Sequence, residues 1–536
     1  MFASSASALS LVAAAGAHPS LQAASESTSP IKAPPIEYGA LSPILIVLSV
    51  AIAGILVEAF LPSRPRRLVQ PLLVGAGFVA ALVALVLLHG KRELLASGAV
   101  AVDGPALFLE GTILVLALTS ILLLAETRIP SIVANAAVVP GTSGARAQLR
   151  SPEIQTEVYP LMSFAVAGML LFAASNNLLI MFVALEILSL PLYLMAGLAR
   201  RRRLLSQEAA VKYFLLGAFS SAFFLYGLAL LYGYANSVDL GAIATAASTA
   251  TSKDAFLYLG LGLLGVGLLF KVGAAPFHSW TPDVYQGAPS PVTAFMAAGT
   301  KVAAFGALIR VLYVAFGGLR WEWRPVIWGI AILTMAVGAI VAITQRDVKR
   351  MLAYSAIAHA GFILVGVAAT SDQGLSGAMF YLVTYGFTTI AAFGIVTLVR
   401  SGETEAGDLS AWAGLGRRSP VVATTFAFLL LALAGIPLTS GFTGKFAVFS
   451  AAEAGGAVAL VVVGLVASAI AAFFYVRVIV LMFFSEPTAD GPLVAKASVS
   501  TYAAIAIGTA ATLVLGVAPQ PLHDLADSAA RLGFVR

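Results

Sequence analysis

Long runs of apolar residues, separated by short polar stretches, fill the chain from Pro43 to Ala518. A helix needs roughly 20 apolar residues to cross the ~30 Å hydrocarbon core of a bilayer. Fourteen runs come close to this length: residues 43–61, 71–89, 103–125, 158–175, 177–199, 207–232, 256–287, 290–316, 324–343, 346–369, 374–399, 420–450, 456–484 and 499–518. This pattern predicts an all-α polytopic membrane protein, with one transmembrane domain over residues 41–518.

Composition supports a bilayer as the main surroundings of the chain. Of the 536 residues, 60% are hydrophobic and 10% are charged, whereas soluble domains average about 25% charged. The chain has no cysteine, so it cannot ligate an iron–sulfur cluster or a zinc ion through thiolates. A net charge of +6 over this length does not indicate nucleic-acid binding.

Basic residues indicate how the chain crosses the bilayer, because loops on the cytoplasmic side carry an excess of Lys and Arg. With the N-terminus outside, the strongly basic loops all fall inside; they contain Arg64, Arg66, Arg67, Arg200, Arg201, Arg202, Arg203, Arg346, Lys349, Arg350, Arg417 and Arg418. We therefore predict that both termini face outward, with an extension over residues 1–40 and a short tail over 519–536. The loop over residues 126–157 is expected to lie inside.

Several ionisable residues lie inside the apolar runs, where a charge is costly. They are Glu186, Lys212, Lys271, Lys301 and Lys445. A charged side chain at the bilayer centre costs about 2.5–3.5 kcal/mol on insertion scales, so these groups must be paired or hydrated. His278 and His359 lie in the same runs, and imidazole, which titrates near neutral pH, can relay protons between lysines.

A purely structural interpretation competes with a transport function. A buried Glu186–Lys271 ion pair can fix helix register, and Glu208 and Lys212 have the i,i+4 spacing of a surface pair. A lone histidine on an apolar face is often only a hydrogen-bonded core residue. Several lysines with one obvious acid partner nevertheless suit the storage and passage of protons better than inert packing, so we predict a proton pathway.

Two of the apolar runs are interrupted by glycine and proline. Gly273 and Pro276 follow Lys271, and Gly435 and Pro437 precede Lys445. Proline breaks a helix, and non-helical backbone at membrane depth survives only beside protein or a water-filled cavity. Each break falls in the fourth span of a five-span block, and an odd number of spans gives the two blocks opposite orientations. We predict inverted repeats over about 158–316 and 324–484, as in transporters.

A dinucleotide-binding motif is present only by spacing. Gly260, Gly262 and Gly265 spell GxGxxG, and Asp283 follows at about the distance of a ribose contact. The fingerprint requires a preceding strand and a soluble helix, whereas these glycines fall inside a predicted span, where small residues allow close helix packing. We therefore predict no dinucleotide site.

Two stretches carry a family resemblance. KVGAAPFHSWTPDVYQGAPSPVTAFMAAGTKVAAF (271–305) and RDVKRMLAYSAIAHAGFILVG (346–366) resemble the antiporter-like proton-channel subunits of respiratory complex I, which are related to Mrp-type cation/proton antiporters. The chain ends soon after its last span, unlike the L type, and carries Lys445 where the M type typically has Glu. ALEILSLPLYLMAGL around Glu186 is similar to the N type.

The resemblance implies a role for each candidate residue. Glu186 matches the acid of the fifth span, and Lys271 matches its partner in the broken seventh span. Lys301 matches the central lysine and Lys445 the terminal one, nearest the outlet. The remaining matches are to tuning residues or to histidines of the central polar axis; they are Lys212, Glu208, His278 and His359.

The resemblance also implies the setting of the chain. It implies a translocase subunit in the inner (plasma) membrane of a bacterium, with membrane-arm and peripheral-arm subunits of complex I as partners. NADH, FMN, iron–sulfur clusters and quinone are expected in those partners, and no cofactor in this chain. The main alternative is an Mrp-type cation/proton antiporter subunit, and a third possibility is a membrane scaffold with inert ion pairs.

Overall fold

The computed structural model describes residues 36–129, 131–132, 141–144, 146, 155–199, 201–249, 254–402, 404–487, 491 and 493–535. Most of the predicted N-terminal extension, much of the 126–157 loop, and Arg200 lie outside the described residues. Ile36–Arg536 form one compact unit.

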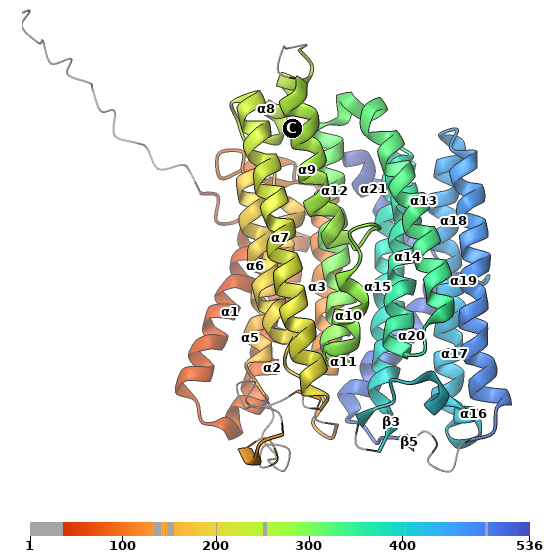
Figure 1. Ribbon diagram of the computed structural model, residues 1–536. Coiled ribbons are helices and arrows are strands. Elements are labelled where there is room, and N and C mark those ends of the chain that lie inside the picture. Colours follow the sequence, from red (N-terminus) through yellow and green to blue (C-terminus); the bar gives the residue numbers. More distant parts are fainter. Residues whose placement is uncertain are drawn as a thin grey trace, which may run out of the picture. The chain divides into compact units, whose positions relative to one another are not determined.

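Helices make up nearly all of this unit (Figure 1). The first part contains α1 (Ser42–Phe60), α2 (Ser63–Leu87), α3 (Gly104–Leu124), α5 (Val158–Ala174), α6 (Leu178–Ala196), α7 (Arg203–Ala235), α8 (Leu240–Ala247), α9 (Asp254–Val272), α10 (Trp280–Gly287), α11 (Ser290–Phe295) and α12 (Lys301–Arg310). The π-helical segments η1 (Met296–Thr300) and η2 (Val311–Ala315) flank α12, so that residues 290–315 run as one continuous helix.

The second part of the chain is also mostly helical. It contains η3 (Gly317–Leu319), α13 (Arg320–Thr344), α14 (Val348–Ala368), α15 (Asp372–Leu398), η4 (Leu409–Trp412), α16 (Leu415–Arg418), α17 (Pro420–Ala434), α18 (Ser440–Ala454), α19 (Val458–Phe484), α20 (Val499–Val517) and α21 (Gln520–Leu532). Two small antiparallel sheets pair β1 (Glu93–Leu95) with β2 (Val100–Val102), and β3 (Val399–Ser401) with both β4 (Thr404–Glu405) and β5 (Leu493–Val494).

The polytopic all-α architecture is confirmed. Twelve helices among the described residues are long and apolar enough to cross a membrane by length and composition, and the shorter apolar helices α5 and α17 coincide with two further predicted spans. The number of crossings stays a prediction. Helix α2 begins at Ser63, eight residues before the predicted start at 71, because Pro71 lies within the helix without ending it.

Burial identifies the centre of the bundle. The segment Ser290–Ala315 is buried throughout its most apolar window, and α14 and α15 are 94% buried in theirs, whereas α1 is only 22% buried. Figure 1 shows α12, α14 and α15 among the other helices, with α1 at the edge. Lys301 and His359, described below, belong to these central helices.

Both predicted helix interruptions are present. Helix α9 ends at Val272 and the chain becomes helical again at Trp280, while α17 ends at Ala434 and α18 begins at Ser440. Gly273 (φ +77°) and Gly435 (φ +88°) turn the chain in the left-handed region, which glycine adopts without strain. Each break leaves backbone carbonyls at a helix C-terminus without an intrahelical donor.

The two halves share a local motif. Asn177 caps α6 and forms a β-bridge with Asp239, and Asp347 caps α14 and forms a β-bridge with Asp408. Each cap side chain accepts hydrogen bonds from the second and third residues after it, as N-cap residues do. Helices α6 and α14 are each the second helix of a predicted repeat, so the shared motif supports the repeats. The inverted repeat as a whole stays a prediction.

Candidate functional site

Lys271 lies at the end of α9, and its side chain is held by a hydroxyl. Its Nζ donates to Oγ of Ser189 at 2.7 Å, and the residue is only 4% exposed. Ser189 donates in turn to the carbonyl of Leu185, one turn earlier in α6. The rings of Tyr193 and Tyr213 lie 5.4 and 5.5 Å from the ammonium. The ammonium is thus surrounded by polar and aromatic groups rather than by lipid.

Glu186 faces the same region but does not contact Lys271. Among the described residues no ion pair within 4.0 Å joins them. Glu186 is nevertheless close enough to act electrostatically on Lys271. Oε1 of Glu186 is buried and has no hydrogen-bond partner. The expected partners are therefore near each other but separated, with Ser189 holding the lysine.

Lys301 begins α12 and reaches the first break. Its Nζ donates to the carbonyls of Val272 at 3.3 Å and Ala356 at 2.9 Å. The Val272 carbonyl is one of those released at the end of α9, so the break provides the binding group. The ring of Tyr385 lies 5.5 Å from the ammonium. Among the described residues, no acidic side chain pairs with Lys301.

His359 lies between the central and terminal lysines. Its Nδ1 is 2.8 Å from Oη of Tyr381, its ring centroid is 5.2 Å from that of Tyr385, and both Lys301 and Lys445 act on it electrostatically. A cavity of about 10 Å³ next to Tyr385 is lined by the hydroxyl-bearing residues Ser355 and Thr389. This volume is at the lower limit for one water molecule.

Lys445 occupies the second break. Its Nζ donates to the carbonyls of Leu433 at 3.2 Å and Ala434 at 2.7 Å, and to Oγ of Ser468 at 2.7 Å. The ring of Phe362 lies 4.8 Å away. Both carbonyls belong to the end of the interrupted helix α17, as the Val272 carbonyl bound by Lys301 belongs to the end of α9. Each break therefore provides at least one backbone carbonyl that accepts a hydrogen bond from a buried lysine.

Lys212 lies apart from this row, in a charged pocket of about 240 Å³. It pairs with Glu208 at 2.6 Å and with Asp283 at 2.8 Å, and its side chain is 42% exposed. Asp283 also accepts from Arg350 at 2.5 Å. The predicted Glu208–Lys212 pair exists, and Asp283, which looked like part of a nucleotide motif, is its third member.

His278 is only loosely held. It is half-buried in the α9–α10 break, its Nδ1 is buried without a hydrogen-bond partner in the described chain, and its ring lies edge-on to Tyr354 at 6.3 Å. Among the described residues, it forms no hydrogen bond with Lys271, Lys301 or Lys445. Its predicted relay role therefore has less geometric support than that of His359.

Sequence reasoning missed several members of the site. Ser189 follows Glu186 by three residues and Tyr385 follows Tyr381 by four, which are same-face spacings in a helix, but serine and tyrosine are common in helix interfaces. The fully buried pair of Arg310 and Asp103, with bonds of 2.9 and 2.7 Å, was also missed because both residues lie near span ends.

The described residues show no cluster of three or more His, Cys, Asp or Glu side chains that could hold a metal ion. Gly260, Gly262 and Gly265 lie within helix α9, which is not the strand–turn–helix context of a nucleotide fingerprint. What the site contains is a row of lysine ammonium groups bound to carbonyls and hydroxyls. Such groups can hold and pass protons.

Comparison with known proteins agrees with this architecture. The family model described as NADH:quinone oxidoreductase/Mrp antiporter, TM, matches residues 175–508. The chain is 72% identical over 510 residues to NADH-quinone oxidoreductase subunit N of Parafrankia sp. (strain EAN1pec), covering 94% of this chain and 97% of the relative. It is 61% identical to the protein of that name from Rhodococcus opacus (strain B4), covering 93% and 97%.

Solved structures show the same fold. A chain of respiratory complex I from Thermus thermophilus with bound Aureothin has a TM-score of 0.72 and 35% identity, covering 90% of this chain and 99% of that one. A chain of the Mrp complex from Dietzia sp. DQ12-45-1b has a TM-score of 0.78 at 21% identity, covering 92% and 97%, and supports the fold alone.

The fold and the lysine row define the class, an antiporter-like membrane subunit of the kind shared by NADH:quinone oxidoreductases and Mrp antiporters. Within this class, the identity to curated relatives is decisive. The chain belongs to the family of NADH-quinone oxidoreductase subunit N.

Proposed function

We propose that this chain translocates protons as a membrane-arm subunit of a proton-pumping NADH:quinone oxidoreductase. The observation that carries the proposal is the row formed by Lys271, Lys301 and Lys445, each buried and each bound by neutral acceptors. A buried lysine without a contacting carboxylate can lose its proton without leaving a bare negative charge behind, so it can both accept and release one.

In this proposal, the distance between Glu186 and Lys271 controls how readily Lys271 gives up its proton. At an effective dielectric of about 20, two unit charges attract by about 4 kcal/mol at 4 Å and about 2 kcal/mol at 8 Å. Movement of Glu186 between these distances changes the energy of protonated Lys271 by about 2 kcal/mol. Moving one charge against 100 mV requires about 2.3 kcal/mol, so several such steps in series can drive transport.

In the proposed sequence, redox chemistry in partner subunits alters the Glu186–Lys271 interaction. Lys271 passes its proton to neutral Lys301, and Lys301 passes one to Lys445 by way of the His359 region. Lys445 then releases a proton on the outer side. Lys212 and Glu208, with Asp283, tune the charge near the first step, and His278 is an additional relay candidate.

Partner subunits supply the redox chemistry in this proposal. NADH, FMN, iron–sulfur clusters and quinone bind to other subunits of the complex, and this chain acts as a translocase within it. We place the chain in the plasma membrane of a bacterium with both termini outside, a topology that the basic loops support. A cation/proton antiporter shares the fold, but the identity to subunit N relatives favours the redox-driven complex.

Replacing Lys301 tests the lysine row. We expect Lys301→Met, in the assembled complex, to reduce NADH-driven proton uptake at least tenfold, because methionine fills the same space but carries no proton. Lys349→Met is the matched control: Lys349 is also 4% exposed and binds the Ala288 carbonyl at 2.6 Å and Glu405 at 3.2 Å, outside the row.

The measurement is proton uptake per NADH oxidised in vesicles with equal amounts of assembled complex. Lys349→Met should retain more than half of the uptake. Equal losses in the two variants would show that removal of any buried lysine is damaging and would refute a specific role for Lys301. Sodium-driven proton exchange by the chain without its redox partners would instead support the antiporter.

A further inference from the structure

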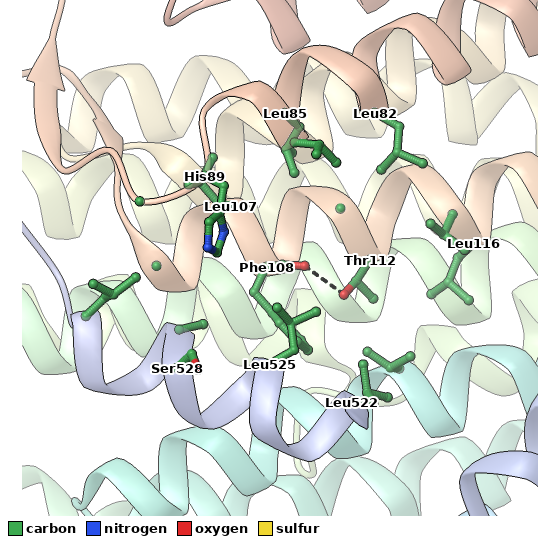
Figure 2. A pocket seen from close by; sticks show the side chains of 18 of the residues that line it. Leu82, Leu85, His89, Leu107, Phe108, Thr112, Leu116, Leu522, Leu525 and Ser528 are labelled. Carbon is green, nitrogen blue, oxygen red and sulfur yellow. Dashed lines mark hydrogen bonds between the residues drawn. The ribbon is translucent and has the colours of Figure 1, made fainter. Parts of the chain in front are cut away.

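A long apolar groove lies between α2, α3, α15 and the C-terminal helix α21 (Figure 2). Its volume is about 490 Å³, within the ~300–1,000 Å³ range of ligand pockets. The walls are mostly Leu, Val and Phe side chains, and the lining residues Val86 and Leu525 are 63% and 50% exposed. The groove is therefore open on one side and is separate from the lysine row.

The groove runs along the bundle rather than across it. It extends over α3 from Gly104 to Leu116, twelve residues or about 18 Å at 1.5 Å per residue. Figure 2 shows α21 following α3, with His89, Leu107 and Ser528 near one end and Leu116 and Leu522 near the other. This length matches one leaflet of a hydrocarbon core about 30 Å thick.

The end near His89 is polar and basic. The side chains of His89 and Arg531 are exposed, and neither has a hydrogen bond or ion pair within the described residues. Arg531 lies at this end because Gly104 packs against Ala529 and Leu532. Arg92, which donates to the Phe534 carbonyl at 3.0 Å, adds a further positive charge close by.

We propose that this groove binds one phospholipid with an anionic headgroup. An acyl chain lies along α3 and α21, and the phosphate is held at the end formed by His89 and Arg531. Apolar walls over the depth of one leaflet suit the hydrocarbon chain, and the guanidinium group of Arg531, which has no partner in the described residues, suits the phosphate.

A helix of a partner protein fits this groove less well. An apolar partner helix would leave the guanidinium group of Arg531 without an acceptor at the His89 end. Charge therefore favours the lipid as the occupant.

Photolabelling of the assembled complex tests the acyl-chain site. The probe is phosphatidylglycerol with a diazirine in one acyl chain, added to complex in nanodiscs. We expect labelled peptides from α3 and α21, and at least a fivefold loss of this labelling in Gly111→Leu. Gly111 lines the groove, and a Cβ there meets only Leu85 at 3.6 Å, so leucine fills the groove without disturbing the helix.

The matched control is Gly75→Leu in α2, where a Cβ meets nothing within 4 Å and the residue does not line the groove. It should leave labelling unchanged. Val115→Phe provides a second variant that fills the groove if Gly111→Leu assembles poorly. Labelling of α3 and α21 that persists in both filling variants, or that is absent from the wild type, would overturn the proposal.

The headgroup is tested separately. The same probe with a phosphatidylcholine headgroup should label α3 and α21 at least threefold less than phosphatidylglycerol. The double variant His89→Gln, Arg531→Gln should remove this preference while acyl-chain labelling continues. Equal labelling by both probes in the wild type, or crosslinking of a photoreactive residue at Leu525 to a protein subunit, would contradict an anionic lipid as the occupant.

Discussion

The three lysines of the row differ in how many of their ammonium hydrogens are bound. An ammonium group has three donors. Lys271 uses one on Ser189, Lys301 uses two on backbone carbonyls, and Lys445 uses three on two carbonyls and Ser468. The number of bound ammonium hydrogens therefore rises along the row from Lys271 to Lys445.

Ser189 is the residue on which Lys271 depends in this arrangement. We expect Ser189→Ala to lower proton uptake per NADH several-fold in assembled complex, because Lys271 loses its one bound acceptor and shifts toward Glu186. Ser189→Thr should restore most of the uptake, since a threonine hydroxyl can also bond the preceding turn. The pH profile of uptake should move in the alanine variant only. An unchanged profile would mean that the serine merely fills space.

The sequence alone identified the functional residues whose charge is unusual for a membrane-spanning helix. Lys271, Lys301 and Lys445 stand out because charges inside apolar runs are rare. Ser189 and Ser468 do not stand out, because hydroxyl groups in membrane helices usually bond their own backbone. Only the three-dimensional structure shows which hydroxyls accept from a lysine.

At the scale of elements, a small sheet on the surface ties distant segments together. Strand β3 pairs with β4 and with β5, although β5 lies more than ninety residues further along the chain. Glu405 in β4 accepts from the Ser290 hydroxyl at 2.8 Å and from Lys349 at 3.2 Å, which links the sheet to α11 and α14. Such short strands leave no recognisable pattern in the sequence, so they were not predicted.

Glu405 gives this region a pH dependence. Burial raises the pKa of Glu405, but Lys349, Ser290 and Arg400 outweigh it and hold the pKa below its ordinary value of 4.5. The ionised form therefore stabilises the fold above about pH 4.5, and this contribution is lost as the pH falls through the lowered pKa.

We expect Glu405→Gln to lower stability by about 1–3 kcal/mol at pH 7, and to lose less additional stability than the wild type between pH 5 and pH 3.5. The measurement is the thermal unfolding midpoint in detergent at each pH. Parallel curves for wild type and variant would show that Glu405 does not contribute to acid sensitivity.

At the scale of the whole molecule, apolar runs were enough to predict most of the long helices, and the glycine and proline residues inside two runs predicted the breaks. The bilayer requires each backbone group to be satisfied within its own helix, so long runs have few alternatives to helix. Details set by packing were less accessible: Pro71 does not end α2, and α8 and α21 are additional helices. The distance between Glu186 and Lys271 likewise depends on packing of α6 against its neighbours.

The proposed topology can be tested directly because the chain has no cysteine. A cysteine at Gly90 should react with an impermeant maleimide from outside intact cells, and a cysteine at Leu204, which is 72% exposed, only after the membrane is opened. The basic residues that follow α1 and α6 are the physical reason. Reversed labelling would invert the assignment of inlet and outlet.

The way each helix break is closed has a consequence for an idle enzyme. Lysine side chains and aromatic rings fill the spaces between the interrupted helices, and the cavity beside Tyr385 has room for about one water molecule. We therefore expect this packing, among the described residues, to hinder the passage of a hydrated sodium or potassium ion past these side chains. On this expectation, a cell membrane that contains many copies of the resting subunit stays charged when NADH is exhausted, because the subunit does not leak ions.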